Sequence, residues 1–319
     1  MQIPIKKTVE RVPGGWMLLP LLAGSLFATF APGAGAFFGS FTNGLFVGAL
    51  PILAVFYVCM GARISFRSIP LVVRRGGALM AAKVGLGVVA AVVVGHFLGV
   101  HAVQSGWLAG FSTLAVVAAI NDTNGGLYMA LMNQYGTDEE SAAYSVMALE
   151  SGPFLTMVTL GAAGLSSFPW PTLVGAILPL VVGMVLGNLD QQMRAFLSGA
   201  PPVLIPFFAF AIGATLNLRH IAEAGMAGVV LGLLTVTISG AVLIVVDRFA
   251  GGNGTAGIAA ATTAGNAAAV PMLVAAANPV YREAAGPATV LVAVSVILSS
   301  ILTPLLTVWW SGRVRSTRG

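Results

Sequence analysis

The sequence predicts an all-α, polytopic membrane protein. This expectation rests on its composition, on the spacing of its apolar segments and on a weak internal repeat. Of the 319 residues, 57% are hydrophobic and only 8% are charged, whereas a soluble domain carries about 25% charged residues. The formal net charge of +5 does not indicate a nucleic-acid partner, because the basic residues lie between apolar segments.

Ten segments are apolar enough to count as transmembrane helices, which need about 20 residues each. The first and sixth are short, and the fourth and ninth are interrupted by polar residues and glycine. We expect the first to be a retained helix rather than a cleaved signal peptide, because many spans follow it. The ten predicted spans are residues 15–31, 44–62, 76–99, 106–134, 141–164, 172–189, 200–217, 225–246, 255–278 and 286–310.

The distribution of basic residues predicts how the chain is oriented. If both termini are cytoplasmic, the inside segments hold twelve Lys and Arg residues and the outside loops hold two, with Lys83 assigned to a span. Basic residues accumulate in cytoplasmic loops, so this orientation is the expected one. The single cysteine, Cys59, excludes an intrachain disulfide.

An internal repeat divides the chain into two halves. At a spacing of 152 positions Phe56 aligns with Phe208, and at a spacing of 145 positions Asn121 aligns with Asn266. Each half holds five spans, so the second half enters the membrane from the opposite side. Inverted repeats of this kind are a common plan of secondary transporters, with the site at the midplane between them. The expected repeats are residues 1–165 and 166–319.

Polar segments interrupt the fourth and ninth spans near their middles. Asn121–Gly126 contains an acid, two amides and a glycine pair, and Thr262–Pro271 contains threonines, Asn266 and a proline. Glycine and proline weaken a helix, and a broken helix exposes amides that attract anions and carbonyls that attract cations. The alternative that these residues only bridge and pack helices stays open. The candidate substrate-binding residues are Asn121, Thr123, Asn124, Gly125, Gly126, Ser151, Thr262, Thr263 and Asn266.

Two acids lie deep in predicted spans, Asp122 in the fourth and Glu150 in the fifth. Burial disfavours the charged form of a carboxyl group, so an acid at such a depth is suited to exchange a proton. We therefore expect Glu150, with Asp122, to bind the coupling ion. Lys83 in the third span is a possible charge partner of these acids, although it could also face an anionic substrate or extend to the lipid headgroups. Asp138–Glu140 is most simply a solvated loop.

The sequence does not indicate an enzyme. It has no GxSxG, phosphate-loop, HExxH or CxxC motif. Its three histidines are too few and too peripheral for a metal site or for a base beside Ser151. We expect no catalytic residue, no metal and no cofactor apart from a coupling ion.

Several motifs give the chain a family resemblance that runs from about residue 11 to about residue 310. The motifs include loops as well as spans, and it is the loops that make the resemblance specific. The chain resembles the 2-keto-3-deoxygluconate permease family in Pro13–Gly15, Pro32–Gly35, Gly39–Gly44, Pro51–Val55, Thr123–Tyr128, Leu149–Pro153, Leu186–Asp190 and Gly254–Ala260.

The resemblance implies a bacterial inner-membrane symporter that imports 2-keto-3-deoxygluconate, a product of pectin breakdown, with protons. It also implies kinship with bile-acid-symporter and sodium–proton-antiporter type folds. In such folds two broken helices, here spans 4 and 9, cross in a core domain beside a panel formed by spans 1, 2, 6 and 7. The core then holds spans 3, 4, 5, 8, 9 and 10. The resemblance further implies an acid at the position of Asn121, one place before Asp122.

Together these features predict a secondary transporter of a small sugar-acid anion, driven by protons and working by alternating access. Two alternatives stay open. Threonine, asparagine and a carboxylate beside unwound carbonyls would also suit a sodium-coupled organic-anion symporter. A passive channel or facilitator would share the same helices but would not accumulate substrate. The sequence leaves the oligomeric state open.

Overall fold

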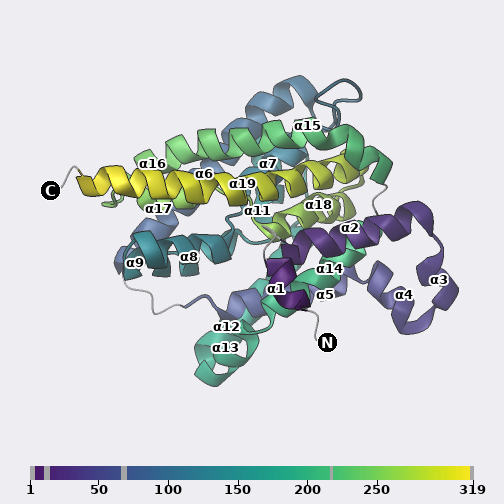
Figure 1. The fold of residues 1–319 in the computed structure, drawn as a ribbon, viewed down its shortest axis with the longest axis horizontal. Helices are drawn as coiled ribbons and strands as arrows, with labels where there is room; N and C mark the ends of the chain where they lie inside the picture. The colour runs from purple at the N-terminus through teal and green to yellow at the C-terminus, as the bar shows by residue number, and fades with distance from the viewer. Residues whose placement is uncertain (1–3, 11–14, 66–69, 216–217, 317–319) are drawn as a thin grey trace.

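The computed structural model describes residues 4–10, 15–65, 70–215 and 218–316, and this part of the chain consists of helices joined by loops and turns (Figure 1). It contains no β-strand, only an isolated antiparallel bridge between Ala102 and Ser112. The all-α prediction is therefore confirmed. The α-helices are α1 (Ile5–Glu10), α2 (Gly15–Phe30), α3 (Ala34–Phe38), α4 (Ser40–Val47), α5 (Ala49–Ala62), α6 (Pro70–Leu98), α7 (Thr113–Asn121), α8 (Gly125–Tyr135), α9 (Asp138–Ala142), α10 (Tyr144–Met147), α11 (Pro153–Ala162), α12 (Trp170–Leu189), α13 (Gln191–Ser198), α14 (Pro201–Gly213), α15 (Leu218–Leu234), α16 (Gly240–Phe249), α17 (Thr255–Ala259), α18 (Val270–Ala277) and α19 (Arg282–Ser316).

Short turns of tighter or wider helix join several of these elements. Three are 3₁₀ turns and one, η2, is a π-helical turn that joins α15 to α16. They are η1 (Ala148–Glu150), η2 (Thr235–Ser239), η3 (Gly265–Ala269) and η4 (Pro279–Tyr281).

Four continuous helical segments are long and apolar enough to cross a bilayer: Pro70–Leu98, Trp170–Leu189, Gly225–Phe249 and Pro279–Val314. Two bent pairs raise this number to six if each pair is one span, namely α4 with α5, at 67°, and α13 with α14, at 43°. The other predicted spans correspond to shorter or broken helices. A multi-pass membrane protein is thus the architecture that these lengths support.

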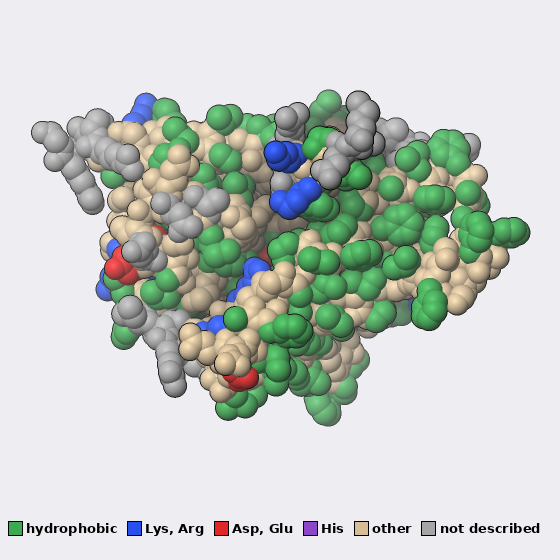
Figure 2. All heavy atoms as spheres, turned by 60° about the horizontal axis from the view of Figure 1, so that its bottom comes forward, with side chains coloured by type: hydrophobic (Ala, Val, Ile, Leu, Met, Phe, Trp, Pro, Cys, Tyr) green, Lys and Arg blue, Asp and Glu red, His purple; other side chains and the backbone are tan. Residues whose placement is uncertain are grey.

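The surface agrees with a lipid environment. Apolar side chains cover much of the face turned to the viewer in Figure 2. Phe41 is 93% exposed and Phe97 is 78% exposed. Polar side chains, by contrast, line the interior, as along α19, where one face carries the fully buried hydroxyls of Ser295, Ser299 and Thr303. Apolar groups outside and satisfied polar groups inside are what a bilayer demands.

One group of helices packs through glycine. Helix α14 lies against α2, and α12 lies against α5. A Cβ atom on Gly183 of α12 would overlap the Val58 carbonyl of α5, and one on Gly213 of α14 would overlap the Leu21 carbonyl of α2. These glycines let the backbones of each pair meet directly. Helix α14 also contacts α4 and α5.

A second group consists of α6, α7, α11 and the helices from α15 to α19 (Figure 1). Helix α6 packs on α7, the α16 segment packs on α17, and α19 packs along α15. The spans predicted to be broken are broken. Helix α7 ends at Asn121 and α8 begins at Gly125, whereas α17 ends at Ala259 and helix resumes only at Gly265.

The fifth predicted span was expected to be one continuous helix, but it is interrupted. The helix stops after Glu150, Gly152 adopts a φ of +105°, and α11 begins at Pro153. A positive φ suits glycine, and proline is well placed at the start of a helix because its missing N–H would be unpaired there. Glu150 is therefore the last residue of the 3₁₀ turn η1, directly before a third break, rather than a residue inside a continuous helix.

Candidate functional site at a helix crossing

The two long breaks meet and are joined by hydrogen bonds. The amide of Ala264 donates to the Asp122 carbonyl at 3.0 Å. The Thr263 hydroxyl donates to the Ala119 carbonyl at 3.0 Å, and the Asn124 amide donates to the Thr262 hydroxyl at 2.9 Å. Backbone groups that each broken helix leaves unpaired thus pair with the other break. The two polar segments singled out in the sequence form one site.

Local sequence explains where each half-helix begins. The Ser112 side chain accepts from the Ala115 amide at the start of α7. The Asn124 side chain accepts from the Leu127 amide at the start of α8. Serine and asparagine are favoured N-caps, and Asn124 therefore restarts the helix immediately after the break.

Asp122 faces the second break. Its Oδ2 atom accepts a 2.6 Å hydrogen bond from the Asn266 amide group, and its side chain is 2% exposed. The backbone of Asp122 is extended, with φ −124° and ψ 127°. A shift of one position therefore does not turn the side chain by the about 100° expected on a helix.

Asn121 points elsewhere, into a buried contact among α6, α7 and α11. Its amide group donates to the Thr159 hydroxyl at 2.9 Å. A Cβ on Gly87 of α6 would overlap the side-chain Oδ1 of Asn121, so the glycine lets this side chain approach α6. Asn121 thus joins the first break to its neighbouring helices.

Glu150 belongs to the crossing. Its Oε1 atom accepts a 2.7 Å hydrogen bond from the Thr123 amide, and the side chain is 1% exposed. Its Oε2 atom has no hydrogen-bond partner among the described residues. Adding a proton to this oxygen would neutralise a carboxylate that is otherwise buried with its charge. The neighbouring Ser151 is 7% exposed.

Lys83 reaches the crossing from α6, and its side chain is fully buried. Its ammonium donates to the Thr123 hydroxyl at 2.8 Å, to the Thr262 carbonyl at 3.2 Å and, at a longer 3.4 Å, to the Ala260 carbonyl. The lysine therefore does not extend to the headgroups. It binds oxygens of both breaks.

Helix α19 holds the second break in place. The Thr263 amide donates to the Ser299 hydroxyl at 3.1 Å, and the Thr263 hydroxyl lies 2.8 Å from that of Ser295. The Thr303 hydroxyl donates to the Ala261 carbonyl at 2.8 Å. These serines and threonines were not singled out from the sequence, because isolated hydroxyls are common in membrane helices.

A cavity of about 320 Å³ lies beside the first break, between α5, α8 and the α9–η1 segment. Its lining residues are Arg63, Met129, Ser141, Ala142, Tyr144, Ser145 and Ala148. Tyr144 separates this cavity from the start of α8, because a Cβ on Gly125 would overlap the Tyr144 ring. On α8, Gly126 is exposed and lies one turn from Met129. Cavities of this size suit small ligands.

The sequence did not indicate this cavity. In the sequence, Arg63 was only one of the basic residues assigned to the cytoplasmic side. Tyr144 lies in an apolar segment, where an aromatic side chain is common. Tyr57 of α5 was missed for the same reason. It is buried and contacts the break at Gly152, since a Cβ there would lie 3.2 Å from the Tyr57 ring.

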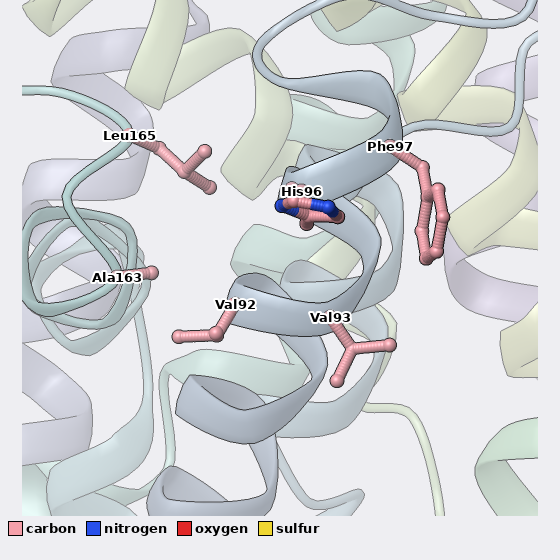
Figure 3. A pocket seen from close by; sticks show the side chains of 7 residues that line it. Val92, Val93, His96, Phe97, Ala163 and Leu165 are labelled. Atoms are coloured by element: carbon pink, nitrogen blue, oxygen red, sulfur yellow. The ribbon is translucent and has the colours of Figure 1, made fainter.

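A larger cavity of about 510 Å³ lies away from the crossing, between α6 and the segment after α11 (Figure 3). Figure 3 shows His96 and Val92 of α6 on one side and Ala163 and Leu165 on the other. Its walls are mostly apolar and include the highly exposed Phe97. It has none of the polar groups that the crossing brings together.

Two acids outside the crossing are also buried. Glu140 is 3% exposed and pairs with Arg75 at 3.3 Å. Asp247 is fully buried and accepts from the Gly254 amide at 2.7 Å. Asp138–Glu140 was interpreted as a solvated loop, but it begins α9 with a capping box made by Thr137 and Glu140.

Comparison with known proteins places this arrangement in a family. The family model described as 2-keto-3-deoxygluconate permease matches residues 6–316. The chain belongs to the 2-keto-3-deoxygluconate permease family. The resemblance seen in the sequence is thereby confirmed.

Two relatives named 2-keto-3-deoxygluconate permease cover nearly the whole chain. The one from Dickeya chrysanthemi is 51% identical over 316 residues, which are 99% of this chain and 93% of the relative. The one from Escherichia coli O9:H4 (strain HS) is 49% identical over 313 residues, which are 98% and 96%. These relatives are permeases and not enzymes, which agrees with the prediction that the chain is not an enzyme.

Proposed function

We propose that this protein imports 2-keto-3-deoxygluconate, a small sugar-acid anion, together with protons and by alternating access. Membership of the permease family supports the substrate. The single observation that supports proton coupling is the environment of Glu150. Its carboxyl group is fully enclosed, accepts a hydrogen bond from the Thr123 amide on one oxygen, and has no partner among the described residues on the other. The crossing of two broken helices around it supports a transport site at mid-membrane.

In this proposal the chain has ten transmembrane helices arranged as two inverted repeats, residues 1–165 and 166–319. Paired contacts support it. Helix α2 packs on α14 as α12 packs on α5, and α6 packs on α7 as α16 packs on α17. Glu150 and its counterpart Ser295, 145 positions later, each contact a threonine of their own half's break, Thr123 and Thr263.

The proposed panel consists of α2, α4–α5, α12 and α13–α14, and the remaining helices form the core. The glycine-mediated contacts of α2 with α14 and of α5 with α12 support a panel that moves as one body. The hydrogen bonds between the two breaks support a core that also moves as one body. Alternating access is then a displacement of the core against the panel.

The substrate is proposed to bind in the cavity lined by Arg63 and Tyr144, beside the first break. Arg63 supplies a guanidinium, which suits a carboxylate. The partly exposed residues of the two breaks, Asn124, Gly126 and Asn266, supply amides for the carboxylate and hydroxyls. Gly125, which Tyr144 separates from the cavity, and the buried Ser151 are proposed to affect substrate binding from behind this surface.

The fully buried candidates have a different proposed role. Asn121, Thr123, Thr262 and Thr263 are at most 1% exposed and bond to protein groups. They are proposed to hold the two breaks together, and to affect substrate binding through that geometry.

The coupling step moves one proton. Glu150 receives it on Oε2 from the side on which substrate enters, and releases it on the other side after the core has moved. Asp122, hydrogen-bonded to Asn266, is the second buried acid of the crossing. The proposed location is a bacterial inner membrane, with both termini in the cytoplasm, as the distribution of basic residues favours.

Uptake of labelled 2-keto-3-deoxygluconate into proteoliposomes, with pH and sodium gradients imposed separately, tests this proposal. We expect accumulation above the external concentration with a pH gradient alone, and no added effect of sodium. Accumulation that requires sodium, and is lost when choline replaces it, would favour the sodium-coupled symporter. Equilibration without accumulation would favour the facilitator.

A further inference from the structure

The ammonium of Lys83 occupies the end of a broken helix at which a cation is favoured. Helix α17 ends at Ala259, and Lys83 donates to carbonyls just beyond, those of Ala260 and Thr262. The last carbonyls of a helix carry partial negative charge. In transporters with broken helices, such carbonyls are the groups that coordinate sodium.

The corresponding end of α7 is filled by neutral donors. The Thr263 hydroxyl donates to the Ala119 carbonyl and the Ala264 amide donates to the Asp122 carbonyl. At the spacing of 152 positions that relates Phe56 to Phe208, Lys83 corresponds to Thr235. Thr235 begins the π-helical turn η2, and its hydroxyl donates within its own helix, to Leu231. The positive charge is thus present at one helix end and not at the other.

The charges around Lys83 balance when one mobile cation is added. Thr123 contacts both sides of the site, since its hydroxyl accepts from Lys83 and its amide donates to Glu150. The adjacent Asp122 is the second acid. If Lys83 is protonated and both acids are ionised, one lysine offsets one carboxylate, and the single negative charge that is left can be neutralised by one proton. Without the lysine, two negative charges and three oxygens would remain, an environment that suits a sodium ion.

We propose that Lys83 is a resident cation that occupies the place of a coupling sodium ion and thereby restricts the transporter to protons. The inference rests on the proposed proton symport and deepens it. The side chain is tethered to α6 and fully buried, so it stays in the site through the transport cycle. A sodium ion would have to displace it from three oxygens and leave an ammonium buried without partners.

Sodium binding to neutral variants tests the proposal without any transport measurement. Thermal unfolding of the purified full chain is measured in sodium chloride and in choline chloride at equal ionic strength. The variants are Lys83→Ala, Lys83→Gln and Lys83→Arg, with Lys7→Ala in the exposed α1 as the control. We expect sodium to raise the unfolding temperature of the Ala or Gln variant by about 3 °C or more, because ligands stabilise the state that binds them. We expect no such rise in the native chain, Lys83→Arg or Lys7→Ala.

Three results would overturn the proposal. They are an equal sodium response in the native chain, no response in either neutral variant, and failure of both neutral variants to fold even in sodium. The last counts against it because the ion should replace the lost charge. Native uptake that ignores the pH gradient would instead remove proton coupling and leave this binding result intact, so the two failures are distinguishable.

Discussion

The amide of Thr123 and the carboxylate of Glu150 are joined by a 2.7 Å hydrogen bond, which ties the break in one predicted span to the break in the next. Thr123 lies between α7 and α8, and Glu150 lies just before the turn at Gly152. Any change in the charge of Glu150 therefore acts directly on the backbone of the crossing. This coupling of a titratable group to an unwound backbone supports the proposal that the crossing is the transport site.

Close contact between α5 and α12 should depend on Gly183. Replacing Gly183 by Ala places a methyl group against the Val58 carbonyl, and such overpacking costs about 1–3 kcal/mol. Gly175→Ala is the matched control, because a Cβ on this glycine of the same helix meets nothing within 4 Å. Thermal unfolding in detergent should show a lower unfolding temperature for Gly183→Ala only. Equal stability of the two variants would contradict the direct backbone contact.

The Asp122–Asn266 pair should tolerate an exchange of its members better than a single change. Asn266→Asp places two carboxyl groups where a 2.6 Å hydrogen bond now lies, and Asp122→Asn removes the charge. The double variant Asp122→Asn/Asn266→Asp restores one acid and one amide. We expect it to recover about 1–3 kcal/mol of the stability lost in Asn266→Asp, as measured by thermal unfolding. Strictly additive single effects would mean that the two side chains do not interact.

Arg63 should control the apparent affinity for the sugar acid. A hydrogen bond to a charged group contributes about 1.5–3 kcal/mol, so Arg63→Ala should raise the KM for uptake about tenfold or more, with a smaller change in maximal rate. Arg63→Lys keeps the positive charge but loses the planar guanidinium, so its KM should lie between those of the native chain and Arg63→Ala. Arg313→Ala is the control, since that guanidinium lies over the Trp309 ring at 4.1 Å, near the end of α19. An unchanged KM in Arg63→Ala would place the substrate carboxylate elsewhere.

The sequence was sufficient to predict the two long breaks, because polar residues within apolar spans are costly unless they pair. It also contained the signal for the third break, Gly152 followed by Pro153, but the apolar residues around it were interpreted as one continuous span. The pairing of Glu140 with Arg75 lies outside what patterns reveal, because the two residues are distant in sequence and meet only in the fold. The cavity at Arg63 was missed for the same reason.

The position of the Lys83 side chain could not be predicted from the sequence pattern. A lysine within a predicted span is equally compatible with a headgroup contact, a salt bridge or a ligand contact. What decides is the position of Nζ, which lies 2.8 Å from the Thr123 hydroxyl. That position depends on how α6 packs against both breaks, and no local signal in the sequence encodes it.

The most direct test of the account compares Glu150→Gln with the native chain in two uptake measurements. Glutamine keeps an oxygen for the Thr123 amide but does not exchange a proton. Glu139→Gln is the control. The pKa of Glu139, in α9, lies below its ordinary value because its carboxylate accepts hydrogen bonds from its own amide and from Thr137.

We expect Glu150→Gln to exchange labelled for unlabelled 2-keto-3-deoxygluconate across the membrane, but to lose accumulation driven by a pH gradient. Glu139→Gln should retain both activities. Accumulation by Glu150→Gln at the native level would contradict the assignment of the proton to Glu150, and with it the central claim.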